Sequence, residues 1–334
     1  MVKARKYVVK RHFQGEPKKD DYELIEYELP PLKDGDILVK AEWISVDPYL
    51  RAYNSQLLTP YDQFSAQVGV VLESKSPDFP VGCRIVSQKG WCDYSIVNPK
   101  DKLKVELGVY RLPNLGDLSP SLGVGAVGMP GATAYFGFLE ICKPKAGETV
   151  VVTGAAGAVG SLVGQIAKIK GCRVVGFAGS DEKVKWLETE LGFDKAINYK
   201  TANVVQALKD AAPKGVDCYF DNVGGEISSQ IMMSQMNLHG RVSVCGSISS
   251  YNESNLPKAT IVQPSLVFKQ LKVEGFIVSR WLDRWPEAFA DIIQWIKSGK
   301  LRPREHITEG FDKLFDAFVG MLAGENIGKA VVKV

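Results

Sequence analysis

The spacing of apolar residues changes near residue 118. Before that point the apolar runs are short and are interrupted by Gly and Pro, as in 36–46, 67–74 and 82–97. Runs of this kind, with little helical periodicity, indicate strands joined by turns. The first part of the chain is therefore predicted to be rich in β-structure.

Beyond residue 118, strand-like apolar runs alternate with segments of helical periodicity. A first helix is expected within 128–142. Strands are expected at 150–153, 173–177, 216–221, 241–245 and 273–278, and helices at 159–170, 182–191, 204–211, 227–237 and 285–298. This alternation is typical of βαβ units and a parallel sheet, so an α/β fold with a doubly wound sheet is predicted.

The last 24 residues predict an amphipathic helix, a turn and a strand. A single terminal strand needs a sheet to join, and the β-rich first part is the expected host. We therefore expect a discontinuous β-rich domain, formed by 1–125 and 302–334, around a nucleotide-binding domain at 126–301. The length of 334 residues fits two domains of ordinary size.

Composition narrows the class of protein. The net charge is +3, with both signs interspersed, so neither a nucleic-acid nor a membrane partner is expected. The basic start lacks an apolar run typical of a signal peptide, and no apolar run approaches the roughly 18 residues that span a bilayer. None of the six Cys forms a CxxC pair, which favours reduced thiols in a cytoplasmic protein.

The segment 154–160 joins a predicted strand to a predicted helix through small residues. Gly157, Ala158, Val159 and Gly160 open the helix, where free backbone N–H groups and the positive end of the dipole favour phosphate. The strand, turn, helix and second strand fall in the register of a dinucleotide-binding fold. The alternative is a helix that packs closely through its small residues and binds no ligand.

The second strand of this unit ends at 177–180 without the acid that NAD-binding proteins usually place there. A carboxylate would repel a 2′-phosphate, whereas small residues leave room for one. Lys183 follows in the first turn of the next helix, and Tyr199 follows the predicted third strand. These residues favour NADP(H) over NAD(H), although Lys183 could also be an ordinary solvated lysine.

Seven motifs spread along the chain carry a family resemblance. They lie at 28–51, 128–142, 154–172, 179–184, 217–226, 251–257 and 324–334. The chain resembles the zinc-independent medium-chain dehydrogenases/reductases, and more closely the prostaglandin reductases, also called leukotriene hydroxydehydrogenases or alkenal/one oxidoreductases. The resemblance implies a Rossmann domain inserted into a GroES-like partial barrel, and usually a homodimer. It also implies NADPH-dependent reduction of the carbon–carbon double bond of α,β-unsaturated ketones and aldehydes, such as 15-oxoprostaglandins and alkenals.

The resemblance also implies site residues. Gly157 to Gly160 would hold the pyrophosphate, and Lys183 and Tyr199 the 2′-phosphate. Further cofactor contacts are implied at Asn222, Cys245, Gly246, Ser247, Ile248, Ser249, Ser250, Tyr251, Phe276, Ile277, Val278 and Asn326. Tyr49 matches a tyrosine that the family places near the substrate. Phe268 stands where related enzymes often have a second Tyr, so the role of that position is open.

The expected chemistry needs no metal. Hydride addition to an enone creates an enolate, so the site must stabilise negative charge on the carbonyl oxygen. Tyr49, a cofactor ribose hydroxyl or water could do so, although Tyr49 could also be a structural turn residue. The three His lie at 12, 239 and 306, outside any Gly-His-Glu motif, and Cys83 and Cys92 lack partners at zinc spacing.

Three other functions remain open at this point. The chain could be a quinone oxidoreductase of the same fold, could oxidise leukotriene-type lipid alcohols, or could bind NADP without turnover. The size of the substrate pocket depends on the loops 54–64 and 250–265, so the sequence does not rank eicosanoids against short alkenals.

Overall fold

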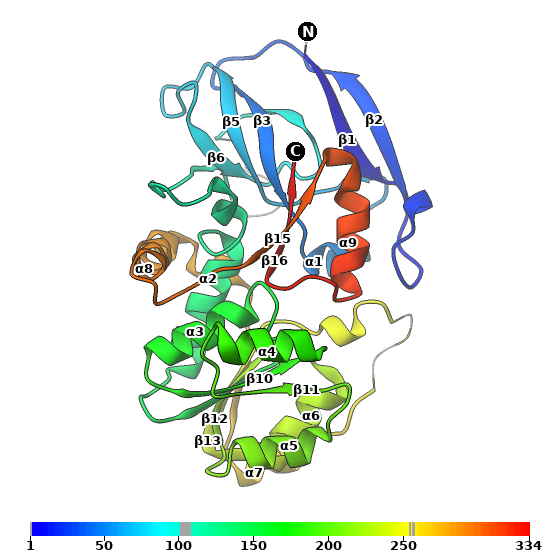
Figure 1. Cartoon of the computed structure of the whole chain (residues 1–334). Coiled ribbons are helices and arrows are strands. Elements are labelled where there is room, and N and C mark those ends of the chain that lie inside the picture. The colour runs from blue at the N-terminus through cyan, green and yellow to red at the C-terminus, as the bar shows by residue number, and fades with distance from the viewer. Residues whose placement is uncertain (1, 101–107, 254, 256–257) are drawn as a thin grey trace. The chain divides into compact units, whose positions relative to one another are not determined.

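The computed structural model describes residues 2–100, 108–253, 255 and 258–334. They divide into two compact units, which are shown in Figure 1. Unit 1 comprises 1–128 and 305–334, and unit 2 comprises Met129–Arg304. The C-terminal segment is therefore part of the unit that contains the N-terminal segment.

Unit 1 is built on β-sheets. Its larger sheet has the order β15-β16-β3-β5-β6-β8, with β7 also pairing with β3, and its smaller sheet has the order β2-β1-β4. The strands are β1 Lys3–Val9, β2 Tyr22–Glu28, β3 Ile37–Ser45, β4 Tyr61–Asp62, β5 Gln67–Ser74, β6 Arg84–Ser87, β7 Tyr94–Val97, β8 Tyr110–Arg111, β15 Glu305–Glu309 and β16 Lys329–Lys333.

The C-terminal strand completes the larger sheet of unit 1. β16 pairs antiparallel with β3, with Val331 opposite Ser45, and parallel with β15. Its residues Ala330 to Val332 are fully or almost fully buried. A strand so apolar requires partners on both sides, and β3 and β15 supply them (Figure 1).

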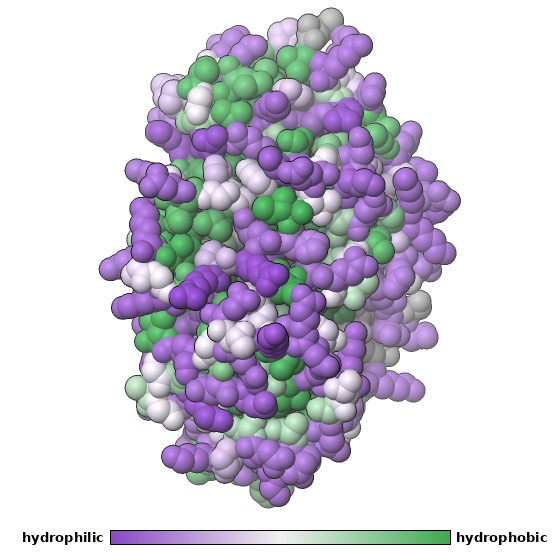
Figure 2. Space-filling view, in the orientation of Figure 1, coloured by the Kyte–Doolittle hydropathy of each residue, from purple (hydrophilic) through white to green (hydrophobic). Residues whose placement is uncertain are grey.

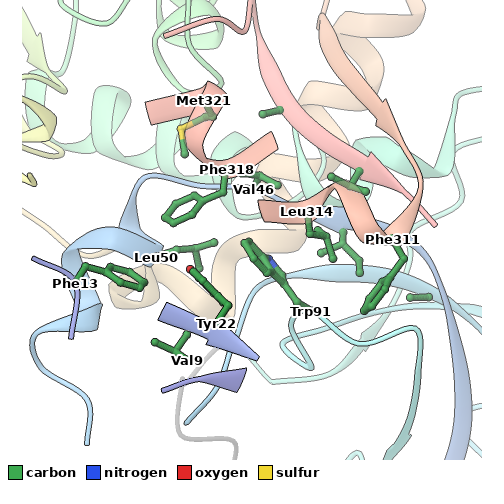
Figure 3. Packing of buried hydrophobic residues seen from close by; sticks show 14 residues of the cluster. Val9, Phe13, Tyr22, Val46, Leu50, Trp91, Phe311, Leu314, Phe318 and Met321 are labelled. Atoms are coloured by element: carbon green, nitrogen blue, oxygen red, sulfur yellow. The ribbon is translucent and has the colours of Figure 1, made fainter. Parts of the chain in front are cut away.

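An aromatic core fixes the two helices of unit 1, α1 (Tyr49–Asn54) and α9 (Leu314–Leu322). Figure 3 shows Trp91 among these side chains, and its ring stacks on Tyr22 with centroids 5.4 Å apart. Phe318 meets Trp91 edge to face at 5.8 Å. The core further includes Val46, Leu50, Leu314 and Met321. The short helix α1 was not expected from the sequence. The buried side chain of Leu50 holds this helix against the core. Six residues are too few to show a helical period in the sequence.

Unit 2 confirms the predicted α/β alternation. Its described residues form a parallel sheet in the order β11-β10-β9-β12-β13-β14. The strands are β9 Thr149–Val152, β10 Arg173–Ala178, β11 Lys195–Asn198, β12 Val216–Asp221, β13 Met236–Val244 and β14 Lys272–Gly275. The helices are α2 Met129–Phe136, α3 Gly160–Ile169, α4 Asp181–Thr189, α5 Val204–Ala211, α6 Gly225–Ser234, α7 Gln263–Phe268 and α8 Trp285–Lys297. Right-handed crossovers place α3 and α4 on one face of the sheet and α5 and α6 on the other.

Four elements in the described part of unit 2 differ clearly from the prediction, and one of them is α7, which was not expected. The segment 128–142 is an α-helix only to Phe136 and continues as a π-helical turn to Cys142. β13 begins at Met236, because that buried side chain joins the core below the sheet and pairs with Val216. β14 ends at Gly275, and a 3₁₀ segment begins at Val278, where the sequence predicted a continuing strand.

The surface is mostly polar. Hydrophilic residues cover most of the face in Figure 2, and the apolar residues gather in a few groups. Within the residues that the structure describes, no helix combines the length and the apolarity needed to cross a bilayer.

The aromatic core of unit 1 predicts a measurable stability effect. Phe318→Ala should lower the free energy of unfolding by about 3–5 kcal/mol, because it removes a fully buried ring and leaves a cavity against Trp91. Asp316→Ala, an exposed position on the same helix, serves as the matched control and should change it by less than about 1 kcal/mol. Urea unfolding of both variants is the measurement, and equal effects would contradict this description of the core.

Candidate functional site

The carboxyl end of β9 leads into a turn that only small residues can make. Gly154 has a φ of 60°, and a Cβ added to Gly160 would lie 2.3 Å from the Gly154 carbonyl oxygen. The Ala155 N–H donates to the Phe177 carbonyl at 3.0 Å, which ties the turn to the end of β10. α3 therefore begins directly above the sheet edge, with its N-terminal backbone in position to meet an anion.

The strand order reverses between β9 and β12, and Asn222 lies at this switch point. Its Nδ2 donates to the Thr153 carbonyl at 2.7 Å, and its Cβ lies 3.2 Å from the position that a Gly154 Cβ would take. In open α/β sheets, ligands bind in the crevice outside the carboxyl ends of the strands at such a point. The structure thus brings Asn222 to the glycine turn, and its contact with a cofactor stays a prediction.

Asp221, the last residue of β12, holds this edge together. It is 2% exposed. One carboxylate oxygen accepts from Thr153 Oγ1 at 2.9 Å and from the N–H groups of Val223 and Gly224 at 2.9 and 3.0 Å, and the other accepts from Ser228 Oγ at 2.6 Å. Sequence reasoning did not single out this residue. The sequence feature that could have identified it is an acidic residue at the end of an apolar strand, directly before Asn222.

The segment 245–251 follows β13 and packs on the same edge. The Cys245 N–H donates to the Asp221 carbonyl at 2.8 Å, and the Ile248 N–H donates to the Asn222 carbonyl at 3.2 Å. The Tyr251 hydroxyl accepts from the Ser247 N–H at 3.3 Å. Burial, reinforced by the Asp221 carboxylate, raises the pKa of the Cys245 thiol to about 12, so that it stays protonated.

A cationic group lies where β10 ends. The Ser180 hydroxyl caps α4 by accepting from the Lys183 N–H at 3.3 Å. A Cβ added to Gly179 would lie 3.2 Å from the Tyr199 hydroxyl oxygen and 3.4 Å from Lys200 Cε. Burial lowers the pKa of Lys183, and the charge of Lys200 lowers it further. Two lysines, a phenol and a helix N-terminus converge here, an arrangement that suits an anion.

Lys200 was missed in the sequence analysis. The parallel pairing of β10 with β11 places Ala178 opposite Asn198, so the residues that follow both strands emerge together. Tyr199 was assigned to the end of β10 because it follows the predicted third strand. Lys200 follows the same strand and could have been assigned there for the same reason. Lys200 is exposed and lies close enough to Lys183 to affect its pKa.

The three consecutive residues 276–278 have different surroundings. The Phe276 ring packs against Trp281, with centroids 5.6 Å apart, and occupies the space above Gly137. Ile277 is exposed and Val278 is buried. Phe268, on α7, is 80% exposed. These residues belong to unit 2, at and beyond the edge strand β14.

Tyr49 and Asn326 belong to unit 1. Tyr49 begins α1, and its ring stacks on Phe64 with centroids 5.9 Å apart. Burial raises the pKa of Tyr49 well above its usual range, and the Asp47 carboxylate raises it further, whereas hydrogen bonds with the Ser65 side chain and the Ala66 backbone act in the opposite direction. Asn326 precedes β16 and donates to the Gly328 carbonyl at 2.7 Å.

Metal-binding residues do not cluster in the part of the chain that the structure describes. No group there of three or more His, Cys, Asp or Glu side chains could hold an ion. The six Cys are all free thiols, four of them buried.

Comparisons with known proteins agree with this geometry. Residues 5–105 match the model of an N-terminal domain of oxidoreductase, and residues 158–298 match the family described as zinc-binding dehydrogenase. The chain is 49% identical to prostaglandin reductase 1 of Bos taurus, over 100% of both chains. It is 38% identical to the NADP(+)-dependent 2-alkenal reductase of Nicotiana tabacum, over 100% of this chain and 98% of that one.

A solved structure is also similar over nearly its full length. CurA from Vibrio vulnificus in complex with NADPH superposes with a TM-score of 0.91 at 35% identity, covering 99% of each chain. Unit 1 and unit 2 both fall within the similar region. Through this identity along its whole length, the chain belongs to the prostaglandin reductase family of medium-chain dehydrogenases/reductases.

Proposed function

We propose that this protein uses NADPH to reduce the carbon–carbon double bond of α,β-unsaturated ketones and aldehydes. The proposal depends on one combined observation. The sheet of unit 2 has the strand order of a dinucleotide-binding fold, in a chain that is 49% identical over its whole length to a prostaglandin reductase. The NADP(+)-dependent 2-alkenal reductase relative and the NADPH complex of CurA support the choice of cofactor and of reaction.

The residues at the sheet edge fit a dinucleotide phosphate. Gly157, Ala158, Val159 and Gly160 would hold the pyrophosphate at the start of α3, because a Cβ at Gly160 would close the approach between helix and strand. Asn222 and the segment 245–251 line the same edge and would contact the nicotinamide side. Residues 276–278 and Asn326 complete the set that family resemblance proposes.

Lys183, Tyr199 and Lys200 would hold the 2′-phosphate that distinguishes NADPH from NADH. Gly179 leaves the space that a carboxylate fills in NAD-binding folds. The two ammonium groups repel each other without an anion, as the lowered pKa of Lys183 reflects. A doubly charged phosphate relieves that repulsion, whereas a ribose hydroxyl does not.

NADPH, when bound, supplies the hydride that adds to the β-carbon of the enone. The protein must then stabilise the negative charge that develops on the carbonyl oxygen. Tyr49 is proposed to donate a hydrogen bond to that oxygen. Its raised pKa keeps the phenol neutral, so the donor is present throughout the neutral pH range. Asp47 reinforces that state, since a nearby carboxylate disfavours tyrosinate.

A single phenol suits conjugate addition better than direct reduction of the carbonyl. Direct reduction concentrates charge on an alkoxide, whereas conjugate addition spreads it over an enolate, so a weaker donor suffices. The α-carbon then takes its proton from water. The apolar aromatic surface of Tyr49, Tyr53 and Phe64 would accept the hydrocarbon part of an alkenal or a 15-oxoprostaglandin.

Three competing functions are separated by one assay. NADPH oxidation is measured with an enone, with a quinone and with no substrate, and a leukotriene-type alcohol is tested with NADP⁺ in the reverse direction. Turnover of the enone alone supports the proposal. Turnover of only the quinone or only the alcohol would replace it, and binding of NADPH without turnover would indicate a non-catalytic protein.

A homodimer formed through the edge of unit 2 is part of the proposal. β14 is one of the two outer strands of the sheet among the described residues, with β11 at the opposite edge, and an edge strand presents unpaired N–H and C=O groups. Large apolar side chains lie exposed beside it, namely Val267, Phe268, Val273 and Ile277. A second copy would extend the sheet and cover these side chains. We also propose a cytoplasmic location, in keeping with the six free thiols.

The cofactor proposal predicts a selective loss of affinity. A charge-assisted hydrogen bond of about 1.5–3 kcal/mol means that Lys183→Ala should weaken NADPH binding roughly 10- to 150-fold, with NADH binding nearly unchanged. Lys200→Ala should act in the same direction by a smaller factor, because its side chain is exposed. Lys185→Ala, on an exposed position of α4, is the control. Titration by calorimetry decides, and equal affinity of the parent protein for both cofactors would refute the assignment.

The reaction proposal predicts both a product and a donor. An α,β-unsaturated ketone should give the saturated ketone by mass spectrometry and NMR, and allylic alcohol as the main product would overturn the assignment.

Tyr49→Phe should lower kcat about 100-fold, since one preorganised donor contributes at most about 2.7–4 kcal/mol and water substitutes in part. Tyr27→Phe, which removes a phenolic hydroxyl from β2, is the control. Because the pKa of Tyr49 is raised, its deprotonation should not lower the rate until the pH exceeds about 10.

The dimer proposal is tested by molar mass in solution. The parent protein should sediment as a dimer, and the double variant Val267→Asp/Phe268→Glu should sediment as a monomer because it places charges on the covered face. Leu58→Glu changes an equally exposed apolar residue of unit 1 and should leave the dimer intact. A monomeric parent protein would show that the edge of β14 has another role.

A further inference from the structure

A buried ion pair lies next to α1 in unit 1, and only the effect of its carboxylate on the Tyr49 pKa entered the function proposed above. Lys329 Nζ is 3.0 Å from Asp47 Oδ1, and both side chains are 5% exposed. Lys329 begins β16, and Asp47 stands two residues before Tyr49. Segments almost 300 residues apart thus meet directly beside the proposed donor.

Every hydrogen-bonding group of the Lys329 ammonium is engaged. Besides Asp47, it donates to the Val46 carbonyl at 2.7 Å and to the Ala330 carbonyl at 2.8 Å, which uses its three N–H groups. The second oxygen of Asp47 accepts from Ser45 Oγ. The turn between β3 and α1 is therefore held through both its side chains and its backbone.

This network continues to the Tyr49 hydroxyl. Ser65 is fully buried, and its Oγ donates to the Ser45 carbonyl at 2.5 Å. Burial and the nearby Asp47 carboxylate raise the pKa of the Tyr49 hydroxyl, whereas the Ser65 side chain and the Ala66 backbone, which lie close to it, act in the opposite direction. The Ser45 N–H in turn donates to the Ala66 carbonyl at 2.8 Å. The groups that orient the phenol are thus the groups that the ion pair holds.

Stability alone does not account for a pair in this place. Removing two charges from water costs about as much as their attraction returns, and an apolar pair of similar size often replaces a buried ion pair without loss. The Lys329 pKa is lowered by burial, against the effect of Asp47, which shows that this cost is present here. Glu305 supplies a comparison, because this half-buried carboxyl group lies near Lys329 and accepts from Ser121 Oγ at 2.6 Å, outside the turn that carries Tyr49.

We propose that Lys329 and Asp47 are positioning residues for the reduction, which act by fixing the turn 45–48 and the direction of the Tyr49 hydroxyl. This inference rests on the proposed role of Tyr49. The pair makes no contact with the reacting atoms in this account. Its effect on the rate passes through the phenol, so that the effect must disappear when the phenol is absent.

A double-mutant cycle tests this coupling in the full-length protein. The variant Lys329→Met/Asp47→Asn removes both charges together, so that neither is left buried without a partner. It should lower kcat for an enone roughly 10- to 100-fold, as expected for a misplaced catalytic group, with KM and the NADPH dissociation constant within about twofold. Added to Tyr49→Phe, the same pair of substitutions should change kcat less than about twofold. Glu305→Gln, the control, should show no coupling to Tyr49→Phe.

The outcomes separate the two proposals. An equal loss of kcat with and without the Tyr49 hydroxyl, or a folded pair variant with unchanged kcat, overturns the positioning role. A fully active Tyr49→Phe also overturns it, but leaves enone reduction established if the saturated ketone still forms. If the pair variant does not fold, Lys329→Arg keeps the charge and changes the hydrogen-bond geometry. Lys329→Arg is then combined with Tyr49→Phe in the same double-mutant cycle. It should lower kcat when Tyr49 is present, and it should change kcat less than about twofold when Phe replaces Tyr49.

Discussion

A carboxylate that ends a buried strand must be saturated with hydrogen-bond donors, and Asp221 shows what this requirement imposes on unit 2. An unpaired charge in such a place is among the most costly groups that a fold can contain. Its donors come from Thr153 after β9, from the turn at 223–224 and from Ser228 on α6. The carboxyl ends of β9 and β12 and the start of α6 are thereby fixed relative to one another. Asn222 follows directly on this carboxylate, and segment 245–251 bonds the backbone carbonyls of Asp221 and Asn222, so both are placed at an edge that the carboxylate helps to fix.

The phosphate site proposed for unit 2 depends on small side chains as much as on charged ones. Gly160 lets helix and strand approach, and Gly179 leaves room beneath Tyr199 and Lys200. Gathering two lysines at this place is unfavourable in the absence of an anion, and part of that repulsion appears as the lowered pKa of Lys183. In the function proposed above, selectivity between cofactors would therefore be built partly into the free protein, as an electrostatic cost that only the more highly charged ligand removes.

The sequence predicted the parts of this protein that follow from periodicity and small-residue motifs. β12 and α5 have the predicted bounds, because β12 is an apolar run buried on both faces of the sheet and α5 buries one face of a helix. α1 was missed because six residues show no period and because its anchor, Leu50, packs on α9, which lies far along the chain. Lys329 was likewise unremarkable in sequence, since nothing local indicates that its ammonium group is buried beside Asp47. Both the helix α1 and the burial of Lys329 depend on contacts between segments that are far apart in the chain, and a single sequence does not show such contacts.

The position of β15 and β16 has a consequence for biosynthesis. These strands belong to the same sheet as β3, yet the ribosome makes them only after all of unit 2. Domains generally fold as units during synthesis, with earlier segments folding first. Unit 2 has all of its own strands as soon as residue 304 has left the ribosome. In the first 128 residues, β7 covers the first part of one edge of β3, but the part at 43–45 that pairs with β16 still lacks its partner. The nascent chain thus completes the inserted unit before the unit that surrounds it, and an exposed β3 edge is the surface that a chaperone would have to protect in the interval.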